Sequence, residues 1–94
     1  MPHESQDFLA TSAALEATAA VEHERWAHWQ KYLHEQCTVL EDGSLLIPAH
    51  LVERWERQIA TPYDALSDQE KSSDREQAHE YLAALRQASS DGKA

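Results

Sequence analysis

The fold is decided by residues 15–37, which read LEATAAVEHERWAHWQKYLHEQC. At about 100° per residue, the apolar positions of this stretch fall within one stripe roughly 80° wide. The members of the stripe are Leu15, Ala19, Trp26, Trp29, Leu33 and Cys37. The positions between them include the charged residues Glu16, Glu24, Arg25, Lys31 and Glu35. The pattern predicts an amphipathic helix over residues 12–36, with the tryptophan-bearing side packed in a core.

Glu22 lies in the middle of this apolar stripe. Burying an ionised carboxylate without a partner is costly, because the charge loses its hydration. Two outcomes are therefore open. Either the side chain reaches solvent at the edge of the stripe, or it pairs with an Arg or a Lys.

A turn and a second helix are expected next. Within residues 38–47, the pair Asp42-Gly43 separates two short apolar pieces, and Gly43 can adopt the positive φ that a tight turn needs. Those pieces are so short that a small hairpin and an irregular loop are both open. Pro48 suits the first turn of a helix that runs to residue 60. The apolar stripe of that helix is Leu51, Val52, Trp55 and Ile59.

The third helix is predicted over residues 67–88. It begins with the capping-box sequence SDQE at residues 67–70, in which Ser and Glu satisfy each other's backbone N–H groups. Its apolar stripe is Ala78, Tyr81, Leu82 and Leu85. Continued upstream, the same stripe reaches Lys71, Asp74 and Arg75, which are costly at core positions unless they are paired.

Composition limits the class of protein. The chain has 94 residues, enough for one domain, and 41% of them are hydrophobic. We predict a single all-α domain over residues 1–94, a small three-helix domain with a short hairpin or loop between its first two helices. Residues 1–8 and 89–94 are expected to be frayed.

Charge and hydropathy bear on partners and location. Seventeen acidic and eight basic residues give a net charge of −9, which argues against binding a nucleic-acid backbone and is compatible with a basic protein partner. No apolar run approaches the ~18 residues of a membrane span, and no leader is visible. We therefore expect no nucleic-acid or membrane partner and a cytoplasmic location, the host cytoplasm if the chain is phage-encoded.

Catalytic and metal-binding patterns are not found in the sequence. His23 and His28 are five residues apart and point about 140° from each other, whereas a zinc helix needs two His four apart. Cys37 at the end of the apolar stripe fits a small hydrophobe better than a nucleophile. We expect no enzyme, no catalytic residue, no metal and no cofactor.

The sequence TPYDALSDQEKSSDR at residues 61–75 resembles the characteristic motif of the ryanodine-receptor repeat, the RyR domain. In that family a run P-Y-x-x-L-x-x-x-E-K-x-x-D-R follows a helix that carries H-E-x-W-A. The matching residues of the helix are His23, Glu24, Trp26 and Ala27. Those of the second motif are Pro62, Tyr63, Leu66, Glu70, Lys71, Asp74 and Arg75. The resemblance covers about residues 15–88.

Two departures from the family pattern are visible. Residues 36–40 replace the usual glycine- and tyrosine-containing stretch, and the second helix stands where the family has a shorter loop. This variant resembles the small stand-alone proteins of bacteriophages and their hosts. The resemblance implies a compact helical interaction module, suspected in such settings of recognising nucleotides or nucleotide-derived signals.

Two roles are open for the charged residues of the second motif. Lys71 and Arg75 lie four apart on one helical face, and with flat surfaces from Tyr63 and Trp26 they could receive a phosphorylated ligand. Alternatively, Asp74 and Arg75 pair with acidic or histidine side chains of the first helix and fasten the two long helices together. The side chains available for that pairing are Glu22, His23 and Glu24.

The function expected first is a non-enzymatic binding module for a nucleotide or another phosphorylated small molecule. The alternative is an acidic protein-interaction module, or an inhibitor of a host nucleic-acid-handling or defence protein. A hydrolase is the least favoured, because no general base, nucleophile or metal set is in place. A homodimer is also open, since three tryptophans in a short chain can cover apolar surface between two copies.

Overall fold

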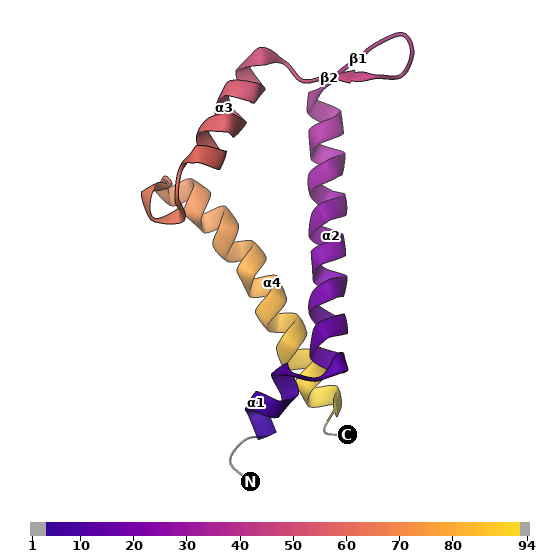
Figure 1. Ribbon diagram of the computed structural model, residues 1–94, viewed down its shortest axis with the longest axis vertical. Coiled ribbons are helices and arrows are strands. Elements are labelled where there is room, and N and C mark those ends of the chain that lie inside the picture. The colour runs from indigo at the N-terminus through magenta and orange to yellow at the C-terminus, as the bar shows by residue number, and fades with distance from the viewer. Residues whose placement is uncertain (1–3, 93–94) are drawn as a thin grey trace.

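The computed structural model describes residues 4–92. The chain is mostly helical, with one small antiparallel hairpin (Figure 1). In chain order its elements are α1 (Glu4–Leu9), α2 (Ser12–Gln36), β1 (Thr38–Val39), β2 (Leu45–Leu46), α3 (Ala49–Ala60), the 3-10 turn η1 (Tyr63–Ala65) and α4 (Asp68–Gly92). The predicted helical class is thus confirmed, and of the two alternatives left open for residues 38–47 the hairpin is formed, whereas α1 is a further helix that was not predicted.

The ends of α2 follow from its flanking residues. The Thr11 hydroxyl oxygen accepts a hydrogen bond from the Ala14 backbone N–H at 3.2 Å, which satisfies one of the N–H groups left free at the start of a helix. At the other end, Cys37 has extended backbone angles and leads directly into β1. The predicted bounds of this helix, residues 12–36, are confirmed.

The hairpin forms around the predicted turn. Gly43 has φ 90°, a conformation that L side chains rarely adopt. The Asp42 side chain accepts a hydrogen bond from the Ser44 backbone N–H at 2.9 Å and steadies the turn. The two strands pair antiparallel, with Thr38 opposite Leu46 and Val39 opposite Leu45.

The capping box of the third predicted helix is formed as expected. The Ser67 hydroxyl oxygen accepts from the Glu70 backbone N–H at 3.2 Å, and a Glu70 carboxylate oxygen accepts from the Ser67 backbone N–H at 3.2 Å. The Ser67 hydroxyl also donates to that carboxylate, and these hydrogen bonds lower the pKa of Glu70. The helix α4 therefore begins at Asp68, directly after its cap.

The helices form an open arrangement (Figure 1). The start of α2 crosses the last part of α4, and the two helices diverge toward their other ends, which α3 and the hairpin connect. The radius of gyration is 18.2 Å, whereas a compact domain of this length has about 12 Å. Among the described apolar residues, only Ala14 and Leu51 are buried. The chain thus has little core of its own.

This openness corrects the burial expected for α2. Its apolar stripe is largely exposed, with Leu15 66%, Trp26 52% and Trp29 41% accessible, while Leu33 and Cys37 are half-buried. The reason is that α2 and α4 diverge from their crossing, so α4 does not cover the whole length of α2 (Figure 1). Within α2 only Ala14 is buried, so the packed apolar face predicted for this helix is not formed.

The stripes of the other two helices are also covered in part only. On α3, Leu51 is buried and Trp55 half-buried, whereas Val52 and Ile59 are exposed. On α4, Tyr81 and Leu85 are half-buried, whereas Ala78 and Leu82 are exposed. The charged upstream part of that stripe escapes the cost of burial, because this half of α4 lies away from α2 (Figure 1).

The predicted frayed ends differ from the structure. Residues 4–9 form α1, and α4 continues to Gly92, four residues beyond its expected end. Residues 1–3 and 93–94 of those predicted ends lie outside the described part of the chain.

Candidate functional site

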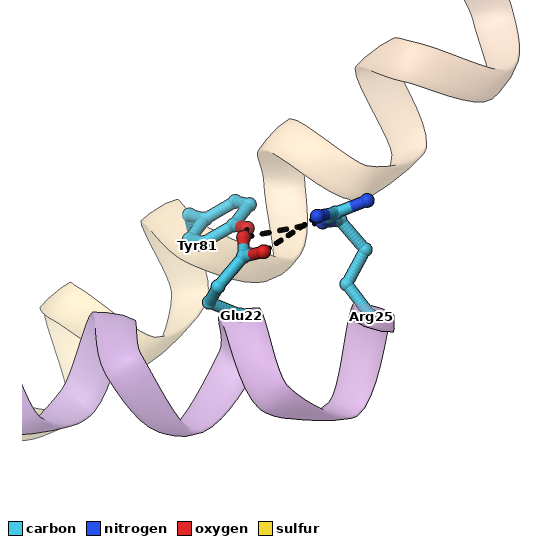
Figure 2. Close-up of polar contacts among 3 residues, drawn as sticks. All are labelled: Glu22, Arg25 and Tyr81. Carbon is cyan, nitrogen blue, oxygen red and sulfur yellow. Dashed lines mark hydrogen bonds and ion pairs between the residues drawn. The ribbon is translucent and has the colours of Figure 1, made fainter. Parts of the chain in front are cut away.

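Glu22 joins the two long helices where they cross (Figure 2). Its carboxylate accepts a hydrogen bond from the Tyr81 hydroxyl of α4. The same carboxylate accepts from Arg25 one turn along α2, with Nε at 3.1 Å from one oxygen and Nη2 bonded to the other. The side chain is exposed and has a cationic partner, so both outcomes left open for this acid are met at once.

These contacts keep Glu22 ionised. The hydrogen bonds from Arg25 and then Tyr81 lower the pKa of Glu22 from 4.5 to about 2. The same carboxylate raises the pKa of the Tyr81 hydroxyl, since losing its proton would forfeit that hydrogen bond. The guanidinium of Arg25 is stabilised in its charged form by Glu22, which raises its pKa.

An aromatic cluster links α2 to α3. The rings of Trp29 and Trp55 meet edge to face with their centroids 5.5 Å apart, and Tyr32 stacks on Trp29 at 5.4 Å. Edge-to-face contacts of this kind are favourable beyond the area they bury. The contact between Trp29 and Trp55 thus connects α3 to α2.

Two of the predicted ligand-binding residues lie together. The Lys71 Nζ is 5.7 Å from the centroid of the Tyr63 ring, within the range of a cation–π contact. Arg75 follows one turn along α4 and is exposed. In the part of the chain that the structure describes, the one ion pair is Arg25–Glu22, which leaves Lys71 and Arg75 without a carboxylate partner there.

Trp26 does not join this group. Its ring stacks on His23 of the same helix at a centroid distance of 6.1 Å. The turn η1, which carries Tyr63, lies beside α3 at the start of α4 and far from α2 (Figure 1). The four residues predicted to bind a ligand are therefore divided between two separate places.

The other residues of the RyR-like motif have local structural positions. Pro62 precedes η1 and the half-buried Leu66 follows it, while Glu70 completes the cap of α4. Asp74 is exposed on α4, and Glu24 lies beside a hollow between α2 and α4.

The predicted pairing of Asp74 and Arg75 with the first helix is wrong for the described residues. The two long helices are joined instead by the hydrogen bond from Tyr81 to Glu22, and Arg25 also donates to the Glu22 carboxylate. The divergence of α2 and α4 away from their crossing is again the cause, because it separates the start of α4 from α2 (Figure 1). The spacing of Glu22 and Arg25, three residues apart on one helix, was a signal that could have indicated this pair.

Two of the hollows at the surface of residues 4–92 bear on ligand binding. One of about 270 Å³ lies between α2 and α4, and its ionisable side chains include Glu24, Glu80, Arg25 and His28. The other, about 420 Å³, lies between α1 and the end of α4, where Phe8, Leu9 and Leu85 contribute apolar surface. Carboxylates border the first and a single cation, Arg86, borders the second, so neither presents the paired cations expected of a phosphate site.

Within residues 4–92, no group of three or more His, Cys, Asp and Glu side chains is placed to hold a metal ion. None of the described helices is both long enough and apolar enough to cross a membrane.

The geometry defines a class of molecule: a small open helical module with an acidic surface and uncovered apolar side chains. Comparison with known proteins adds no family to this, because no family model, no curated protein and no solved structure matches the chain. The resemblance to the RyR domain stays a prediction.

Proposed function

We propose that the chain is a non-enzymatic protein-interaction module that binds another polypeptide through the apolar side chains of β2 and α3. The observation that carries this proposal is that α3 has an apolar stripe of the kind that packs in a core, yet two members of that stripe are exposed. On α3, Val52 and Ile59 are seven residues apart, so they lie on the same side, and they are 41% and 77% accessible.

Further apolar side chains are exposed just before α3 in the chain. Leu46 and Ile47, which come directly before α3, are 55% and 41% accessible. We call Leu46, Ile47, Val52 and Ile59 the β2–α3 surface. A contiguous exposed apolar patch is typical of a surface that binds proteins, whereas single exposed apolar residues need no explanation, so the proposal is that these four side chains act together.

Site-specific photo-crosslinking tests the proposal. A photoreactive phenylalanine analogue is placed at Ile59 or, as a control, at His50, which is exposed and lies about 180° around α3. We expect a crosslinked product from position 59 in the producing cells and none from position 50. Equal products from both positions, or none from either, would contradict the proposal.

A second candidate function is the binding of a phosphorylated small molecule beside Tyr63. It is favoured by the contact of Lys71 with the Tyr63 ring and by the cation of Arg75 one turn along α4. An ammonium and a guanidinium beside an aromatic face suit a phosphate and a base. Thermal-shift measurements with nucleotides test it: a rise in melting temperature that Lys71→Ala abolishes supports the candidate, and no rise at millimolar nucleotide refutes it.

A further inference from the structure

We infer that the polypeptide bound by the β2–α3 surface is a second copy of this chain, in a two-fold symmetric dimer. This inference rests on the proposed function and names its partner. It is carried by the amount of uncovered surface, by the unsupported hairpin and by the shape of the molecule.

The uncovered area exceeds what a stable dimer needs. The chain exposes 7613 Å² of accessible surface. A compact monomer of 10.7 kDa exposes about 5,500 Å². The difference, roughly 2,000 Å², is more than twice the ~800 Å² that each partner contributes to a standard interface. A second copy can therefore bury a full interface and still leave this chain with the exposure of an ordinary domain.

The hairpin has apolar side chains that no other part of the described chain covers. Successive strand residues point to opposite faces, and Leu45 and Leu46 are 38% and 55% accessible. The chain thus leaves apolar side chains exposed on both faces of β2. A hairpin with two-residue strands is marginal in water unless something packs on it.

The shape of the molecule suits a copy of itself. Its extents are 59 × 35 × 17 Å, so it is a flat plate, whereas stable domains consist of two or more packed layers. Two plates related by a two-fold axis supply each other's second layer. Such an interface uses the same surface on both copies, so the same apolar residues are covered in each copy by the other.

Charge separates this partner from a basic protein. Each copy carries a net charge of −9, so two copies repel each other at long range. Added salt screens that repulsion and strengthens the apolar dimer, whereas a complex with a basic protein weakens in salt. The salt dependence of association therefore has opposite signs for the two kinds of partner.

Analytical ultracentrifugation of the purified full chain tests the inference. We expect about twice the chain mass of 10.7 kDa at micromolar concentration, and a dissociation constant that falls as salt rises. Ile59→Glu should raise the dissociation constant roughly 100-fold or more, because each copy brings one added carboxylate into the interface. His50→Glu adds the same charge on the opposite side of α3 and should leave the constant unchanged.

Further measurements keep the result decisive. If the Ile59→Glu variant loses its helical circular dichroism, the Val52→Glu variant takes its place in the centrifugation experiment. The dilution series of the unaltered chain tests the dimer without any variant. A mass of 10.7 kDa at all concentrations overturns the dimer. If position 59 then still crosslinks to a different protein, the interaction module stands with another partner, and if it does not, both proposals fall.

Discussion

Replacing Trp55 by alanine tests whether the aromatic cluster holds α3 in place. The substitution removes a half-buried indole and its edge-to-face contact with Trp29. Full burial of a Trp is worth about 3–5 kcal/mol on truncation to Ala. Because Trp55 is only half-buried, we expect the free energy of unfolding to fall by about 2 kcal/mol. In a domain of this size that corresponds to a melting temperature lower by roughly 8–16 °C.

The measurement is urea unfolding followed by circular dichroism at one fixed chain concentration, since association shifts apparent stability. Trp26→Ala is the matched control. That indole is 52% accessible and stacks only on His23 of its own helix, so its loss should cost less than about 1 kcal/mol. Equal destabilisation by the two substitutions would refute the role assigned to the contact between Trp29 and Trp55.

Three more predictions concern the polar contacts. The pKa of Glu22 falls on folding from 4.5 to about 2, so its contribution to stability is present above pH 4.5 and is lost as the pH falls toward 2. Urea unfolding at several pH values should show this loss of stability. Glu22→Gln should remove the share of the pH dependence that comes from Glu22. Tyr81→Phe should destabilise the chain by breaking the contact between α2 and α4, and hydrogen exchange should then be faster in the last turns of α4. Ser67→Ala should cost about 1 kcal/mol in urea unfolding through loss of the cap, whereas Ser72→Ala inside α4 should cost nothing measurable.

Local features of the fold were predictable from sequence because short-range chemistry decides them. The turn at Gly43 needs a residue that tolerates positive φ, and the cap at Ser67 needs a hydroxyl three residues before a Glu. Both are formed by neighbours in the chain. Their prediction did not require knowing where any helix lies.

The burial of the helices was harder to predict, because it depends on how far α2 and α4 stay together. The apolar stripe of α2 indicated a covered face, yet Trp26 and Trp29 are exposed. The sequence of α4 carried a contrary signal, because the apolar stripe of α4 itself continues upstream into charged residues. Lys71 and Arg75 at core-facing positions are favourable only if that half of the helix does not pack.

The candidate site was predicted in part. The pairing of Lys71 with Tyr63 lies within one local segment and is formed. The contact between Glu22 and Tyr81 spans 59 residues, and no sequence pattern indicated it. The addition of Trp26 to the Tyr63 group failed for the same reason, since it depended on the packing of two distant segments.

The open arrangement of the helices means that one chain cannot cover its own apolar side chains. Small-angle X-ray scattering of the Ile59→Glu variant, expected to be monomeric, tests it most directly. We expect a radius of gyration near 18.2 Å. A value of about 12 Å, that of a compact domain of this length, would mean that the helices close on one another and would contradict the claim.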